Sequence, residues 1–314
     1  QSEPTGGWAL CDNGSNLLLV GTSGSLDSYS ATFTLDEALT ANILVNAGGA
    51  VSELISAAGR CNYSYTFMGK TVNGYFDKDT ATHTVDGVTY YEISFGVPTG
   101  KFGETVTFIC DAGVTKNISI DSILAAGEKQ YGDDKNVSAL FKSVRNYGAE
   151  AAAVFYGGEA PAVDYTDTDA LIGKYSSSPT VEKKTYLKGM NLLLKDKVSV
   201  QLYIKTDDIS KLDSVIFNGK TLGSGEYTVS AVTNAALLNE YNYVVSVPVA
   251  VKSMASPVSI VLTESGEKTD AVTVSIGYFC KTYIKNGSAL AQKYAGVSKA
   301  LLEYIDKVAV CYGS

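Results

Sequence analysis

The chain repeats its own sequence at a spacing of about 150 residues. Phe-Met-Gly-Lys-Thr at residues 67–71 returns as Phe-Asn-Gly-Lys-Thr at residues 217–221, and Pro98 returns as Pro248. This period far exceeds that of solenoid repeats, so it predicts two copies of a whole domain. We therefore predict two tandem, similar lobes, residues 1–160 and 161–314. Two similar surfaces suit a long or repetitive ligand better than a single small substrate.

Each lobe begins with segments in which apolar and polar residues alternate, the pattern of half-buried strands. In the first lobe these segments are residues 28–35, 42–47, 62–68, 90–97 and 104–110, with a hairpin turn at Asp86-Gly87. Apolar residues then recur at helical spacing over residues 120–128 and 137–155 in the first lobe, and over about 277–285 and 288–311 in the second. We expect an α+β protein in which each lobe is a β-sandwich followed by a helical pair.

Composition and charge exclude several classes of partner. The formal net charge is −8, which opposes binding to nucleic acid phosphates and to anionic membrane surfaces. No apolar run approaches the roughly 20 residues of a spanning helix. Twenty-one tyrosines against ten phenylalanines is an unusual ratio. A tyrosine joins an apolar ring to a polar tip, which suits exposed contact surfaces.

The five cysteines leave the redox compartment open. There is no Cys-x-x-Cys motif, and an odd count leaves at least one thiol unpaired. Cys280 and Cys311 could bridge two packed helices, whereas buried reduced thiols fit the pattern at least as well.

The sequence holds no recognisable catalytic set. His83 is the only histidine, and no nucleophile elbow, zinc-protease motif or phosphate-binding glycine loop is present. Carboxylates could run a glycosidase without histidine. The acidic candidates are Asp133, Asp134, Glu150, Glu159, Glu240, Glu264 and Glu303. The acidic stretch 164–169 lacks the glycine and distal glutamate of an EF-hand loop. We expect no enzyme activity, no cofactor and no metal.

The helical end of the first lobe carries a resemblance. Asn146-Tyr147-Gly148, small residues and a closing Tyr156-Gly157 resemble a helical segment of tandem-repeat proteins secreted by gut clostridia. The second lobe departs from this pattern at residues 304–307. With its two lobes, the chain resembles the non-catalytic starch-binding (starch adherence) modules of amylosome proteins. The resemblance implies a secreted or cell-surface protein that binds α-1,4-glucan in a groove between or along the lobes. It also implies a scaffold partner, reached through a dockerin outside this chain.

Candidate ligand residues are the aromatics outside regular strands and helices, together with polar neighbours that could bond sugar hydroxyls. Trp8 follows two glycines, Tyr75 and Phe76 follow a turn, and the other rings lie between helices or between lobes. The predicted set is Trp8, Tyr75, Phe76, Tyr131, Asp133, Asp134, Lys135, Tyr165 and Tyr175.

Two other interpretations remain open. The first is a structural or adhesive surface protein that binds a protein partner, which gains if Tyr131, Tyr165 and Tyr175 are buried. The second is a carboxylate-dependent hydrolase, which release of reducing sugar from starch would reveal.

Overall fold

A computed structural model describes residues 10–12, 16–21, 29–35, 39–85, 87–165 and 167–312. The chain forms two compact units, Gln1–Gly148 and Ala149–Ser314. Mixed helices and antiparallel sheets confirm the α+β class. The boundary between the units falls inside helix α3 (Lys135–Tyr156), earlier than the residue 160 predicted from sequence. The last turns of α3 contact residues of the second unit, such as Tyr165, which explains the difference.

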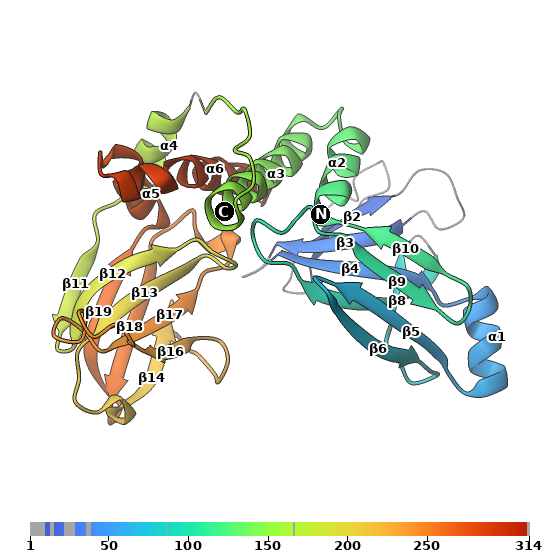
Figure 1. Cartoon of the computed structure of the whole chain (residues 1–314), viewed down its shortest axis with the longest axis horizontal. Helices are drawn as coiled ribbons and strands as arrows, with labels where there is room; N and C mark the ends of the chain where they lie inside the picture. The colour runs from blue at the N-terminus through green and yellow to red at the C-terminus, as the bar shows by residue number, and fades with distance from the viewer. Residues whose placement is uncertain are drawn as a thin grey trace. The chain divides into compact units, whose positions relative to one another are not determined.

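The first unit contains two antiparallel sheets (Figure 1). In spatial order, one sheet consists of β1 (Leu10–Asp12), β2 (Asn16–Gly21), β3 (Tyr29–Leu35), β4 (Leu39–Asn46), β8 (Val88–Gly96) and β7 (Thr82–Val85). The other consists of β10 (Thr115–Ile118), β9 (Val106–Cys110), β5 (Cys61–Phe67) and β6 (Lys70–Phe76).

The second unit also contains two antiparallel sheets. One consists of β11 (Thr180–Lys184), β19 (Glu267–Val274), β18 (Val258–Glu264), β14 (Leu212–Phe217) and β15 (Lys220–Thr221). The other consists of β12 (Leu187–Leu193), β13 (Ser199–Ile204), β17 (Tyr243–Pro248) and β16 (Thr228–Ala231). Short 3-10 helices, η1 (Ile209–Lys211) and η2 (Val251–Ser253), lie in the connections.

The strand orders of the two units match. The order β10-β9-β5-β6 in the first corresponds to β19-β18-β14-β15 in the second, and β3-β4-β8-β7 corresponds to β12-β13-β17-β16. The repeated Gly-Lys-Thr motif marks the same hairpin in both. Met68 and Gly69 have φ angles of 48° and 74°, and Asn218 and Gly219 have 47° and 83°. Positive φ at both positions of a two-residue loop is the I′ hairpin geometry.

Aromatic rings fill the space between the sheets of the first unit. The ring of Phe76 on β6 stacks on Tyr91 of β8 with centroids 4.5 Å apart, and it contacts Tyr63 of β5 at 4.7 Å. Tyr63 lies over Gly74, where any Cβ would come within 2.4 Å of its ring. Glycine at this position therefore lets the tyrosine pack flat against β6.

Helical pairs follow the strands in both halves of the chain. The first is α2 (Ile120–Gln130) with α3, and the second is α5 (Ile276–Lys285) with α6 (Ala289–Tyr312). Ser119 and Ser275 cap the helices that begin after them, through bonds from the backbone N–H groups of Ser122 (3.0 Å) and Tyr278 (3.2 Å). Two further helices, α1 (Gly49–Ala58) and α4 (Thr168–Tyr175), were not predicted from periodicity.

Candidate functional site

Three of the predicted aromatic ligand residues belong to the core. Phe76, Tyr131 and Tyr175 are only 1%, 5% and 6% exposed. Phe76 fills the first sandwich, and Tyr131 stacks on Phe141 of α3 with centroids 5.9 Å apart. A sugar ring needs an open aromatic face, so these rings serve packing instead. This placement corrects the expectation that Tyr131 and Tyr175 contact a glycan.

The polar residues beside Tyr131 have a local role in the loop. Asp134 caps the N-terminus of α3, because its Oδ1 accepts hydrogen bonds from the N–H groups of Asn136 (3.0 Å) and Val137 (3.2 Å). Asp133 and Lys135 are exposed on either side of it. Trp8 lies outside the described residues. Of the predicted rings, Tyr75 is exposed and Tyr165 is half-buried.

Tyr165 belongs to a connector, residues 157–176, that packs on the helices of the second unit. The Tyr165 hydroxyl donates to Oε1 of Glu150 at 3.2 Å, and the Thr168 hydroxyl donates to the Tyr165 carbonyl at 2.8 Å. Further along, Lys174 and the Tyr175 hydroxyl both donate to Oδ1 of Asp306 on α6, at 2.8 and 2.9 Å. The connector is therefore bonded at both of its ends.

Glu150 and Asp306 occupy equivalent places in the two helical repeats. Glu150 precedes the closing Tyr156 by the same six positions by which Asp306 precedes Tyr312. Each buried carboxylate accepts a tyrosine hydroxyl from the connector, yet their acidities shift in opposite directions. Burial raises the pKa of Glu150. Burial also opposes ionisation of Asp306, but the bonds from Lys174, Tyr175 and Lys307 outweigh it and lower its pKa.

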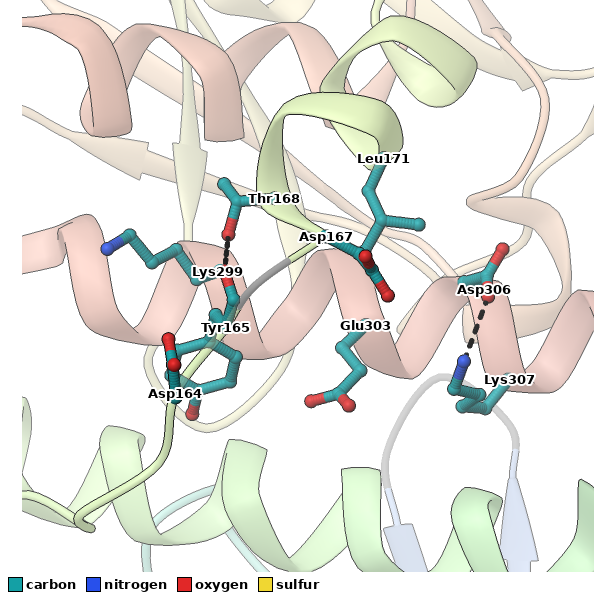
Figure 2. Close-up of a pocket in the computed structure, with 9 residues that line it drawn as sticks. All are labelled: Asp164, Tyr165, Asp167, Thr168, Leu171, Lys299, Glu303, Asp306 and Lys307. Atoms are coloured by element: carbon teal, nitrogen blue, oxygen red, sulfur yellow. Dashed lines mark hydrogen bonds and ion pairs between the residues drawn. The ribbon is translucent and has the colours of Figure 1, made fainter. Parts of the chain in front are cut away.

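Between the connector and α6 lies a small pocket of about 70 Å³. Figure 2 shows Glu303 and Lys307 extending from α6, and Tyr165, Asp167 and Thr168 coming from the connector. The lining residues are Asp164, Tyr165, Asp167, Thr168, Leu171, Lys299, Glu303, Asp306 and Lys307. Within the described part of the chain, the buried Oε2 of Glu303 has no hydrogen-bond donor.

The pocket offers three kinds of contact. Carboxylates can accept bonds from hydroxyl groups, the ammonium groups of Lys299 and Lys307 can donate them, and Tyr165 and Leu171 supply apolar surface. A buried acceptor without a donor costs free energy that a ligand hydroxyl would recover. The arrangement therefore suits a small polyhydroxylated group.

The described residues include no group of three His, Cys, Asp or Glu side chains arranged so that it could hold a metal ion. None of the described helices combines the length and apolarity needed to cross a membrane. Cys280 is a free, buried thiol, so no disulfide joins it to Cys311 on the neighbouring helix, and Cys61 and Cys110 are free thiols as well.

Sequence reasoning found Tyr165 but missed most of its companions. Lys299, Glu303 and Lys307 follow one another at intervals of four, so they form one polar stripe on α6. That spacing was visible in the sequence. What the sequence did not show is that the connector lies across this stripe.

Comparison of the chain with protein-family models, with curated proteins and with solved structures finds no match.

Proposed function

We propose that this protein is a non-catalytic carbohydrate-binding protein, that its ligand is an α-1,4-glucan, and that the pocket beside Tyr165 is one of its contact sites. The observation that carries the proposal is the pocket itself. It joins a half-buried tyrosine ring to carboxylates and ammonium groups, the side chains that bond sugar hydroxyls. The choice of α-glucan rests on the resemblance described above.

Glu303 is the central hydrogen-bonding group in this proposal. The described residues provide no donor for its buried Oε2, and a ligand hydroxyl would satisfy this oxygen once the carboxylate turns toward the pocket. Charge-assisted bonds of this kind contribute about 1.5–3 kcal/mol. Lys299 also lines the pocket, and in this proposal its ammonium group turns to donate to a neighbouring hydroxyl oxygen. Tyr165 would offer the apolar part of its ring to the sugar's C–H groups.

The two units are, in this proposal, copies of one ancestral sandwich with a helical pair. The matching strand orders and the shared hairpin support the duplication. A protein of this kind is secreted or attached to a cell surface, where polysaccharide is encountered. Several weak contacts on one chain raise the overall affinity for a repetitive polymer, because a second contact forms at high effective concentration.

A structural or adhesive role is the second candidate, and two observations favour it. Tyr131 and Tyr175 are buried, which removes two of the expected sugar platforms. In addition, every residue of the edge strands β11 and β16 is exposed. Unpaired edges can accept a strand from a protein partner.

Binding to α-glucan tests the proposal directly. We expect the protein to be retained on insoluble starch and to bind maltooligosaccharides in calorimetry. Glu303→Gln should weaken binding about tenfold or more, because it removes the charged acceptor. Glu182→Gln is the matched control, since Glu182 is exposed on β11 and pairs with Lys268 at 3.2 Å, outside the pocket. No binding to any α-glucan at millimolar concentration would refute the proposal.

A further inference from the structure

The outer face of the sheet β10-β9-β5-β6 in the first unit has an unusual composition. Strand register places one set of side chains on this face, opposite to the core rings. We call this set the Tyr75 face: Asn62, Ser64, Thr66, Thr71, Asn73, Tyr75, Thr107, Ile109, Thr115 and Asn117. None of these ten residues is Asp, Glu, Lys, Arg or His, although the strands belong to a chain with a net charge of −8.

Tyr75 presents an open aromatic ring on this face. It is 52% exposed and lies opposite Asn62 across the β5–β6 ladder. The guanidinium carbon of Arg60 lies 5.6 Å from the ring centroid. Ile109, 50% exposed, lies in the adjacent row of the sheet, opposite Ser64. The Tyr75 ring and the Ile109 side chain are therefore surrounded on this face by hydroxyl and amide groups.

The polar groups of the Tyr75 face are held in place by one another and by the carboxylate of Asp111 at its border. Thr66 and Thr71 share a bond of 3.0 Å, Thr107 donates to Asn117 at 2.9 Å, and Asn62 donates to Asp111 at 2.8 Å. Each hydroxyl and amide group keeps further bonding capacity, because these groups can both donate and accept. Preorganised groups of this kind lose little rotamer freedom when a ligand binds.

These features discriminate among three classes of binding partner. A protein partner usually buries a continuous apolar core, and this face has only Tyr75 and Ile109 to offer. An anionic partner would need more cations than Arg60 at the border. An uncharged polysaccharide matches both properties, since it presents apolar C–H faces and many neutral hydroxyls.

We infer that the Tyr75 face binds an uncharged polysaccharide chain, and that it is a contact surface separate from the pocket beside Tyr165. The polysaccharide would stack a sugar ring on Tyr75 and form hydrogen bonds with Asn62 and Asn73. Only the choice of α-glucan as the first probe rests on the proposed function. The face is open, so it suits internal segments of a polymer.

The test compares variants of the whole protein on soluble amylose and on a panel of other uncharged polysaccharides. Tyr75→Ala should weaken binding to the polymer about tenfold, as loss of one aromatic stacking contact does. Tyr75→Phe keeps the ring and should bind within about twofold of the parent. Val229→Ala is the matched control, because Val229 is an exposed apolar residue on the edge strand β16 of the second unit. Thermal unfolding would check that each variant is folded.

The outcomes separate this inference from the proposed function. If Glu303→Gln weakens amylose binding and Tyr75→Ala does not, the Tyr75 face is no contact surface and the pocket proposal stands. If α-glucans do not bind but another uncharged polysaccharide binds in a Tyr75-dependent way, the inference holds and the proposed function fails. If no uncharged polysaccharide binds, or if Tyr75→Ala abolishes binding of a protein partner instead, the inference is overturned.

Discussion

The sheets β10-β9-β5-β6 and β19-β18-β14-β15 share one strand order and differ on their outer faces. In the second unit, register places Ser214, Ile216, Val261 and Thr273 outward, with no aromatic ring among them. The inward sides of both sheets are buried and apolar, as at Phe108 and Leu262. Burial constrains the inner positions in both units, whereas the outer positions are free to diverge.

The strand after the shared hairpin produces the difference. In the first unit β6 runs for seven residues and carries the exposed Tyr75 as its penultimate residue. In the second unit β15 runs for two residues, and a turn follows in which Glu226 accepts bonds from Lys220 at 2.6 Å and from the N–H of Gly223 at 2.5 Å. The residue 150 positions after Tyr75 is Gly225, with φ 90°. Of these two equivalent sheets, therefore, only the one in the first unit carries an exposed aromatic ring, Tyr75, at this position.

The largest expected effect tests whether the two inner faces are equivalent. Phe108 lies opposite Tyr65 on β5, and Leu262 lies opposite Val215, the residue 150 positions after Tyr65. Both side chains are buried, so Phe108→Ala should cost about 3–5 kcal/mol and Leu262→Ala about 2–5 kcal/mol. Chemical denaturation monitored separately for each unit measures both. A cost below about 1 kcal/mol at one site would break the equivalence.

A smaller effect is expected at Asp306, the acidic residue of the second helical repeat. Its pKa lies below the ordinary 3.8 despite burial, because Lys174 and Tyr175 donate to it. The ion therefore stabilises the fold above about pH 4, and this contribution is lost as the pH falls through the lowered pKa. Asp306→Asn should cost about 1–3 kcal/mol at pH 7 and less at pH 3. Equal losses at both pH values would contradict the charge argument.

The smallest change in stability is expected on substitution of Glu150, the residue in α3 that is equivalent to Asp306. This substitution should stabilise the fold, whereas that of Asp306 should destabilise it. Burial raises the pKa of Glu150 above the ordinary 4.5, so ionisation destabilises the folded state as the pH rises beyond that value. Glu150→Gln keeps an acceptor for the Tyr165 hydroxyl and removes the buried charge. We expect a gain of up to about 1 kcal/mol at pH 7 and none near pH 4. Thermal unfolding at the two pH values measures this, and a loss at pH 7 would show that the charge is needed.

Local patterns predicted much of the fold. Alternation located most strands of the first unit, and helical spacing located α2, α3, α5 and α6 to within a few residues. The helices α1 and α4 were missed because they are short, and few of their residues are buried. Their apolar spacing is correspondingly weak.

The candidate site was less predictable, because burial depends on partners distant in the sequence. Tyr131 looks like a free loop aromatic until Phe141 is seen to stack on it. Tyr175 looks like a linker residue, yet its hydroxyl bonds Asp306, which lies 131 positions further on. Composition drew attention to tyrosine, but only tertiary packing distinguishes exposed rings from buried ones.

The same hairpin turn occurs in both halves of the chain, so the sequence of one turn can suggest a stabilising substitution in the other. Both turns hold their first loop residue at a positive φ, 48° at Met68 and 47° at Asn218. Asparagine tolerates this left-handed backbone, whereas methionine does so at a cost. The second half therefore has a residue suited to this backbone conformation, Asn218, where the first half has the strained Met68. The stabilising replacement at residue 68, Met68→Asn, can therefore be taken from the second half of the same polypeptide.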